Sequence, residues 1–148
     1  MFWTLRGAPH CYRRADLPSV AAAVAPCSET DAARRLYTAA KPLKEAGIGC
    51  LEALDVTASE LGELVTGPRV KGDVSGAVTP RLPDAYLRWC GRCGATHPDE
   101  MLFRFGATRA GLELVLGTSP PVLRPVVPAS GRRVGRRFEP VPTTSFCR

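Results

Sequence analysis

The 148-residue sequence lacks glutamine and asparagine altogether, has only two histidines and contains no long apolar run. Its longest apolar stretch, residues 20–26, is far shorter than the roughly 20 residues that a membrane-spanning helix requires. The first ten residues show no basic segment followed by an apolar one, which argues against a secretory signal peptide. These absences lead us to expect a cytoplasmic protein with no membrane partner.

The cysteines are too scattered to form the disulfide framework of a small secreted protein. The sequence has six of them, at positions 11, 27, 50, 90, 93 and 147, and only Cys90 and Cys93 are closely spaced. We therefore expect most of them to be reduced thiols, either in the core or at the surface.

Positive charge is concentrated near the C-terminus. The formal net charge is +6, and five arginines against one glutamate in residues 128–148 account for +4 of it, which leaves +2 for residues 1–127. Because this tail is rich in proline and arginine and has almost no apolar periodicity, we expect it to be disordered. A body so weakly basic does not by itself predict nucleic-acid binding.

The first 47 residues predict a β-hairpin followed by helices. Aromatic and branched residues on both sides of a Gly-Ala-Pro turn predict the hairpin over residues 2–13. A short alanine-rich helix is predicted within residues 16–26. A second helix is predicted to begin at the Ser28 cap, to break or kink at Pro42 and to end at Gly47.

The first strand begins almost at the first residue, so its partner strand has to be identified. Either the hairpin pairs with a strand further along the chain, or a preceding segment is missing, and we favour the second explanation. Residues 1–47 are therefore interpreted as part of an incomplete preceding unit.

Residues 48–127 have the element order of a winged-helix domain, a helix-turn-helix followed by a β wing. Apolar residues at intervals of three and four predict a helix over residues 51–65. The other expected elements are a helix over 70–78, a strand over 85–90, a helix that begins at the Thr96 cap and ends at Gly111, and strands over 112–116 and 121–127, the last a proline-limited edge strand. The predicted fold class is α+β, with any other small α/β domain as the alternative.

Five separated segments carry a resemblance to a known family. They are Trp3–His10 (WTLRGAPH), Arg13–Pro18 (RRADLP), Gly67–Ser75 (GPRVKGDVS), Trp89–His97 (WCGRCGATH) and Thr118–Leu123 (TSPPVL). In this order they resemble the AlkZ/YcaQ-like winged-helix DNA glycosylases, which are associated with the repair of interstrand crosslinks and alkylated bases. The resemblance implies repeated winged helices and the extrusion of a modified base into a pocket.

The resemblance supplies no catalytic residue. It implies a Gln-x-Gln or Gln-x-Asp pair upstream of the segment Arg6-Gly7-x-x-His10, yet the sequence contains no glutamine. The carboxylates at helical spacing are interpreted as a solvated helix face. We expect that this chain alone does not excise a base, and we interpret it as a truncated or frame-shifted member of the family.

Cys90, Cys93 and His97 form a C-x2-C-x3-H pattern in a glycine-rich knuckle between a strand and a helix. Two thiolates and an imidazole at this spacing can bind tetrahedral zinc, so zinc is a candidate cofactor. A fourth ligand could come from Asp99, Asp84 or Cys50. The alternative is a reduced, metal-free turn in which His97 only packs against the start of the helix.

The predicted DNA contacts are basic residues on the expected helix-turn-helix, wing and first hairpin. A winged helix places its third helix in the major groove, which makes Arg104 and Arg109 candidate contacts there and Arg124 a candidate on the wing. Candidate phosphate contacts are Arg13, Arg14, Lys71 and Arg92, and the family resemblance adds Arg6 and His10. For each residue the alternative is an exposed charge that only keeps the domain soluble.

The sequence thus predicts a DNA-binding winged-helix fragment of a DNA-glycosylase family. One alternative is a small zinc-stapled module that regulates or contacts a protein partner. Another is a decayed piece of a larger enzyme.

Overall fold

The computed structural model describes residues 1–126, so the predicted disorder of residues 128–148 lies outside the described part of the chain. Among these residues the six α-helices are α1 (Leu17–Val24), α2 (Glu29–Leu36), α3 (Ala40–Glu45), α4 (Cys50–Leu64), α5 (Lys71–Val78) and α6 (Glu100–Arg109). The seven strands in the same range are β1 (Phe2–Trp3), β2 (Pro9–His10), β3 (Arg69–Val70), β4 (Leu87–Cys90), β5 (Ala95–Pro98), β6 (Leu112–Leu114) and β7 (Val122–Pro125). The fold class is α+β, as predicted. Within residues 1–126, no helix combines the length and apolar character needed to cross a bilayer.

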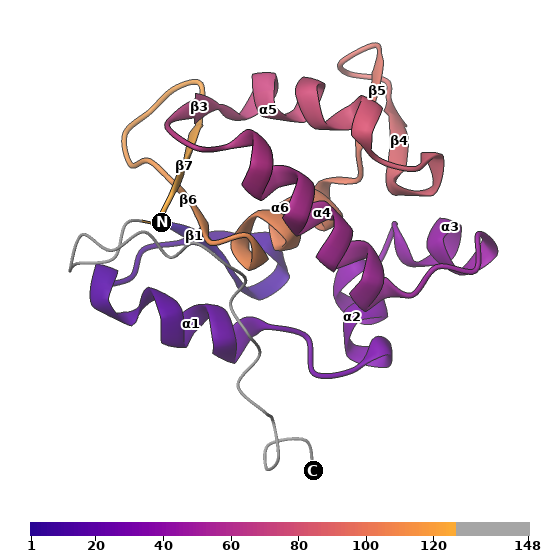
Figure 1. Ribbon diagram of the computed structural model, residues 1–148, viewed down its shortest axis with the longest axis horizontal. Coiled ribbons are helices and arrows are strands. Elements are labelled where there is room, and N and C mark those ends of the chain that lie inside the picture. The colour runs from indigo at the N-terminus through magenta and orange to yellow at the C-terminus, as the bar shows by residue number, and fades with distance from the viewer. Residues whose placement is uncertain (127–148) are drawn as a thin grey trace.

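Helices α4 and α6 pack against each other at the centre of the molecule, and the remaining elements surround them (Figure 1). One buried core runs from Trp3 in the first hairpin through Leu36 and Leu61 to Phe103 and Leu123. Fully burying one such side chain contributes roughly 1.5–3 kcal/mol. The first hairpin, α2 and α3 therefore share a hydrophobic core with the residues that follow them, whereas Leu17 and Ala21 of α1 pack with Phe2 in a second, smaller cluster.

The carboxylate of Glu29 also joins the first segment to the rest of the molecule. Helix α4 is preceded by Gly49, which has no side chain to cap it, and its first amides would otherwise lack partners. The Glu29 carboxylate instead accepts hydrogen bonds from the amides of Cys50 at 2.8 Å and Leu51 at 3.1 Å. A residue at the start of α2 thus stabilises the start of α4.

The main sheet has three antiparallel strands in the order β3-β7-β6. The hairpin of β6 and β7 is confirmed, but the interpretation of the last strand as an edge strand was wrong, because β7 lies in the middle. Strand β3 was also missed, since Val70 was assigned to the following helix and Arg69 to no element. Pro125 is tolerated in β7 because β3 pairs only with Val122 and Leu123, so no neighbour on that side needs the amide that proline lacks.

The first hairpin is confirmed, with Phe2 opposite His10 and Trp3 opposite Pro9. The amide of Leu114 donates to the carbonyl of Met1 at 2.8 Å, so the residue before β1 contacts the end of β6, although β1 and β6 belong to separate sheets. The interpretation of residues 1–47 as part of an incomplete preceding unit stays a prediction.

The helix predicted from Ser28 ends earlier than expected. The Ser28 hydroxyl caps α2 as predicted, accepting from the amide of Asp31 at 3.2 Å, but the helix stops at Tyr37, whose φ is +46°. Pro42 causes no kink, because it lies in the first turn of α3, where a missing amide costs no helical hydrogen bond. Gly47 ends this region with φ of +72°, as predicted.

Residues 95–98 form strand β5, so the predicted helix start at Thr96 was wrong. His97 pairs with Arg88, and the residues between β4 and β5 form a hairpin loop. Helix α6 begins three residues later than Thr96 would require, because the Asp99 carboxylate accepts from the amides of Met101 at 2.9 Å and Leu102 at 3.4 Å. The strand predicted over residues 85–90 is confirmed only from Leu87, since a short 3-10 turn precedes it.

Candidate functional site

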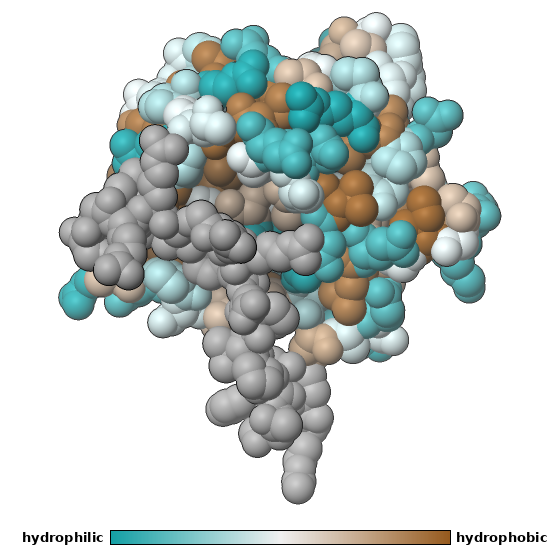
Figure 2. Space-filling view, in the orientation of Figure 1, coloured by the Kyte–Doolittle hydropathy of each residue, from teal (hydrophilic) through white to brown (hydrophobic). Residues whose placement is uncertain are grey.

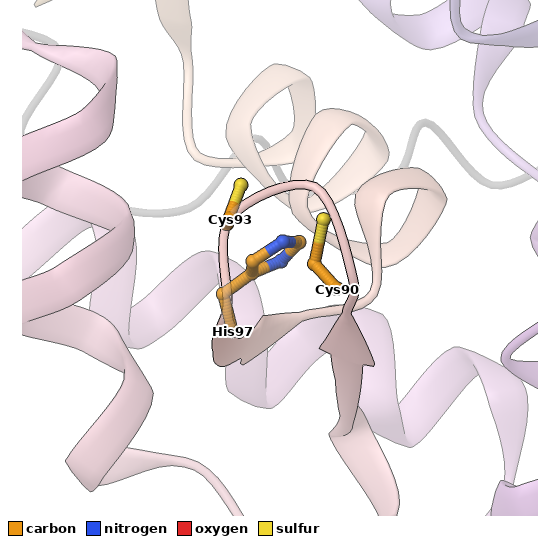
Figure 3. Close-up of side chains that lie close together, drawn as sticks. All are labelled: Cys90, Cys93 and His97. Atoms are coloured by element: carbon orange, nitrogen blue, oxygen red, sulfur yellow. The ribbon is translucent and has the colours of Figure 1, made fainter.

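The hairpin of β4 and β5 brings Cys90, Cys93 and His97 together, as the sequence pattern predicted (Figure 3). Cys90 ends β4, Cys93 lies in the loop, and His97 lies on β5. Their candidate ligand atoms are all within 4.8 Å of one another. The glycine-rich segment therefore joins two strands, and not a strand to a helix as we had expected.

Backbone hydrogen bonds hold the loop in a tight turn. The amides of Cys93 and Gly94 both donate to the carbonyl of Cys90, at 3.1 and 2.9 Å. Gly94 has φ of +60°, a left-handed conformation that glycine adopts without steric cost. This turn directs the Cys93 sulfur back toward the Cys90 sulfur and the His97 ring (Figure 3).

The three side chains perturb one another's acidity. A hydrogen bond with His97, followed by hydrogen bonds with Cys93, lowers the pKa of the Cys90 thiol to about 6. The hydrogen bond with Cys90 raises the pKa of Cys93, and a hydrogen bond to the Pro98 carbonyl together with Cys90 raises the pKa of His97. Cys90 is therefore the more readily ionised of the two thiols, and thiolates are the form that binds metals.

None of the three suggested fourth ligands joins this cluster within residues 1–126. Asp99 is committed to capping α6 and accepts a hydrogen bond from Thr38 at 2.7 Å. Cys50 is buried at the start of α4. The described residues thus offer one imidazole and two thiolates, with one position of a tetrahedral ion left open.

Five of the predicted DNA contacts are held in ion pairs within the molecule. Lys71 lies 3.2 Å from Glu100, and Arg104 binds the same carboxylate at 2.7 Å while donating to the Gly7 carbonyl at 2.8 Å. Arg109 binds Asp55 at 2.7 Å. These contacts anchor the basic side chains to neighbouring elements and leave less of their charge available to a phosphate.

Arg14 and Arg124 share one buried carboxylate. Glu113 is 3% exposed, and each arginine approaches its Oε1 to 2.9 Å. A buried carboxylate requires such partners, because an unpaired charge there would be costly. Both arginines therefore have a structural role beside any contact with DNA.

The other predicted contacts are exposed. Among residues 1–126, Arg6, Arg13 and Arg92 form no ion pair, and His10 bonds through its ring to the Thr4 hydroxyl at 2.8 Å. Arg6 lies in the turn of the first hairpin and Arg92 in the β4–β5 loop. These three arginines remain available for a ligand, and their predicted role stays a prediction.

Helix α6 presents little surface for recognition. None of its residues is fully exposed, and its apolar side chains are buried against α4 and the first hairpin. On the face shown in Figure 2, hydrophilic and apolar residues are interspersed. The predicted contact of α6 with the major groove stays a prediction.

Sequence reasoning missed a groove of about 430 Å³ between the first hairpin, α2 and α6. It is lined by basic, aromatic and apolar residues, namely Leu5, Arg6, Arg34, Arg35, Tyr37, Met101 and Phe105. Tyr37 is 79% exposed, and Arg34 is exposed with no ion pair to another described residue. The Arg34-Arg35 pair followed by an aromatic residue could have signalled this surface, but the helix was interpreted as continuing through it.

The groove also carries unusual backbone conformations. Arg6 and Tyr37 are the non-glycine residues with positive φ within residues 1–126, at +55° and +46°, and both line the groove. Such conformations cost of order 1–3 kcal/mol each and cluster at functional sites. The groove is therefore a second candidate site, separate from the Cys90–Cys93–His97 cluster.

The fold and these sites define an α+β protein with exposed cations beside an aromatic side chain and with a thiol–imidazole cluster on a hairpin. A family model described as DNA glycosylase AlkZ-like matches residues 2–143, so the chain belongs to this family of DNA glycosylases. The family resemblance seen in the sequence is thereby confirmed. No curated protein and no solved structure matches the chain.

Proposed function

We propose that this chain binds DNA as a winged-helix unit of the AlkZ-like family. The observation that supports the winged-helix assignment is the order of elements, in which α4, β3, α5, α6, β6 and β7 follow one another and the sheet order is β3-β7-β6. In a winged helix the first strand likewise pairs with the last, and the turn between the last two strands forms the wing. The β4–β5 hairpin is then an insertion between the second and third helices.

The groove lined by Arg6, Arg34 and Tyr37 is the proposed DNA-contact surface. Two exposed guanidinium groups can bind phosphates, and an exposed aromatic ring beside them can stack on an unpaired base. Arg104 and Arg109 remain predicted contacts, but each would first have to leave a carboxylate that it binds at 2.7 Å. Arg6 and Arg34 form no ion pair with another described residue, so neither would have to leave a carboxylate first.

The absence of glutamine and asparagine supports a binding role without base excision by this chain alone. Cleaving a glycosidic bond needs polar groups that position water, and the family's glutamine-containing pair has no counterpart in the sequence. An assay on alkylated duplex DNA should accordingly release no more free base than a control without protein. The cytoplasmic location stays part of this proposal.

Fluorescence anisotropy with duplex DNA across a salt series tests the proposed surface. The double variant Arg6→Ala/Arg34→Ala should bind more weakly than the unaltered full chain. The slope of log affinity against log salt should fall by about 0.9 for each phosphate that the variant no longer neutralises. The matched control is Lys41→Ala/Lys44→Ala, which removes the same charge from the surface of α3.

Equal weakening of DNA binding in the two double variants would contradict the groove assignment and indicate an effect of net charge alone. Tyr37→Ala should weaken binding to a duplex with an unpaired base more than binding to a fully paired duplex, because only an unpaired base can stack on the ring. A full chain that binds no duplex even at low salt would refute the DNA-binding proposal.

A further inference from the structure

We infer that the β4–β5 hairpin binds one zinc ion through Cys90 Sγ, Cys93 Sγ and His97 Nε2. This inference stands apart from the proposed DNA binding, because it uses other residues on another part of the molecule. In Figure 1 the hairpin lies at the periphery, beside α5 and away from β1 and α1.

The distances among the three side chains suit a tetrahedral ion. Zinc binds thiolate sulfur at about 2.3 Å and imidazole nitrogen at about 2.0–2.1 Å, which places neighbouring ligand atoms about 3.5–3.8 Å apart. The candidate atoms here lie within 4.8 Å of one another. Since Cys93 is exposed and Cys90 and His97 are only partly buried, small side-chain rotations can close the remaining distance.

His97 leaves Nε2 for the cluster, where its ring also hydrogen-bonds with Cys90. Its Nδ1 lies 2.9 Å from the Pro98 carbonyl oxygen, which can only accept a hydrogen bond, so Nδ1 carries the proton. In the neutral ring this leaves the lone pair on Nε2. A histidine whose other nitrogen donates to a backbone carbonyl is the usual arrangement at zinc sites, because that bond orients the ring.

The loop brings both sulfur atoms to the same side of the hairpin. The amides of Cys93 and Gly94 bond to the Cys90 carbonyl, and this turn is what places two thiols three residues apart near one point. Arg92 in the loop supplies positive charge beside the Cys93 sulfur, and its backbone amide hydrogen-bonds with Cys90. The chelate is thus largely formed by the backbone before any ion binds.

The outer part of the hairpin is mostly exposed, although its base contacts α5 and Leu87 packs against the core. It pairs over only four residues on each strand, and Trp89 on β4 is 67% exposed where a packed hairpin would bury an aromatic side chain. Two-stranded hairpins without a hydrophobic face are marginally stable in water. An ion that links the end of β4 to the loop and to β5 would supply the missing stabilisation.

The open fourth position would be filled by solvent or by a ligand from outside the described residues. Within residues 1–126 no further histidine, cysteine or carboxylate joins the cluster. A three-ligand zinc site can therefore also accept an exogenous thiol or imidazole.

The test is titration of the reduced full chain with Zn²⁺ against a chromophoric chelator, and with Co²⁺ followed by absorption spectroscopy. We expect one metal ion per chain, thiolate-to-cobalt charge-transfer absorption, and the d–d bands of a four-coordinate site. Cys93→Ser and His97→Ala should each reduce affinity at least tenfold, whereas His97→Cys should retain binding. Cys11→Ser and Cys27→Ser, which alter exposed cysteines elsewhere, should leave it unchanged.

Hydrogen exchange provides a second measurement that does not depend on the variants. Zinc should slow exchange of the β4 and β5 amides more than that of the α1 amides, because only the hairpin is cross-linked. The inference is overturned if the reduced chain takes up no stoichiometric zinc, or if Cys11→Ser weakens binding as much as Cys93→Ser.

Discussion

Asp99 illustrates how much one side chain contributes to this fold. It is 4% exposed, and its two carboxylate oxygens accept from the first amides of α6 and from the Thr38 hydroxyl. Arg88 lies 3.8 Å away and adds positive charge. Asp99 therefore caps the start of α6, and it joins that helix to the turn that follows α2.

Replacing Asp99 should be costly. We expect Asp99→Ala to lower the free energy of unfolding by about 2 kcal/mol, at the upper end of the range for helix caps, because the Thr38 hydroxyl also loses its acceptor. Urea unfolding followed by circular dichroism measures this. Ser28→Ala, which removes the exposed cap of α2, should cost about 0.5–1 kcal/mol. Equal costs for the two caps would contradict the role given to Asp99.

At the scale of secondary-structure elements, the contact between α4 and α6 depends on a glycine. A Cβ atom at Gly106 would lie 2.6 Å from Cγ2 of Thr57 on α4, closer than real contacts allow. Thr57 is fully buried and its hydroxyl donates to the Ala53 carbonyl at 2.8 Å, so it cannot easily move away. Close packing of the two central helices thus requires glycine at this position.

Gly106→Ala should therefore destabilise the protein despite alanine's better helix propensity. We expect a loss of about 1–3 kcal/mol from overpacking, measured as a lower urea midpoint with an unchanged slope. Gly76→Ala in α5, where a Cβ atom would meet nothing within 4 Å, should instead stabilise by about 0.5–1 kcal/mol. Adding Thr57→Ser to Gly106→Ala should recover part of the loss, since it removes the clashing methyl group.

At the scale of the whole molecule, one carboxylate connects three separate parts. Glu100 on α6 binds Lys71 at the start of α5 and Arg104, and Arg104 in turn donates to the Gly7 carbonyl of the first hairpin. Burial raises the pKa of Glu100, but Lys71 and Arg104 outweigh it and hold the pKa below its ordinary value of 4.5. The ionised form is therefore favoured in the folded state.

This shift predicts how stability depends on pH. A carboxyl group whose pKa is lower in the folded state stabilises the protein above its ordinary pKa, and this contribution is lost as the pH falls through the lowered value. Glu100→Gln should lower the free energy of unfolding by about 0.5–1 kcal/mol at neutral pH. The difference from the unaltered chain should shrink below pH 4.5. Urea unfolding at several pH values checks this, and a difference that stays constant would contradict it.

Local signals in the sequence predicted much of the fold. The Ser28 cap, the apolar repeat of α4, the Gly47 and Gly111 stops and the β6–β7 hairpin depend on neighbouring residues, and the structure bears them out. The spacing of Cys90, Cys93 and His97 likewise predicted a cluster that forms within one hairpin. In each case the partners lie within a few positions of one another, so periodicity and turn chemistry suffice.

What the sequence by itself determined is therefore the family, the α+β class, most helices and the local thiol–imidazole cluster. Only the tertiary structure decided that Glu29 caps α4, that β7 lies between β3 and β6, and that Arg6 and Tyr37 line one groove. It also decided that Arg104 and Arg109 pair with internal carboxylates. These outcomes depend on packing between segments far apart in the chain, where the geometry of the core, rather than local propensity, selects the partners.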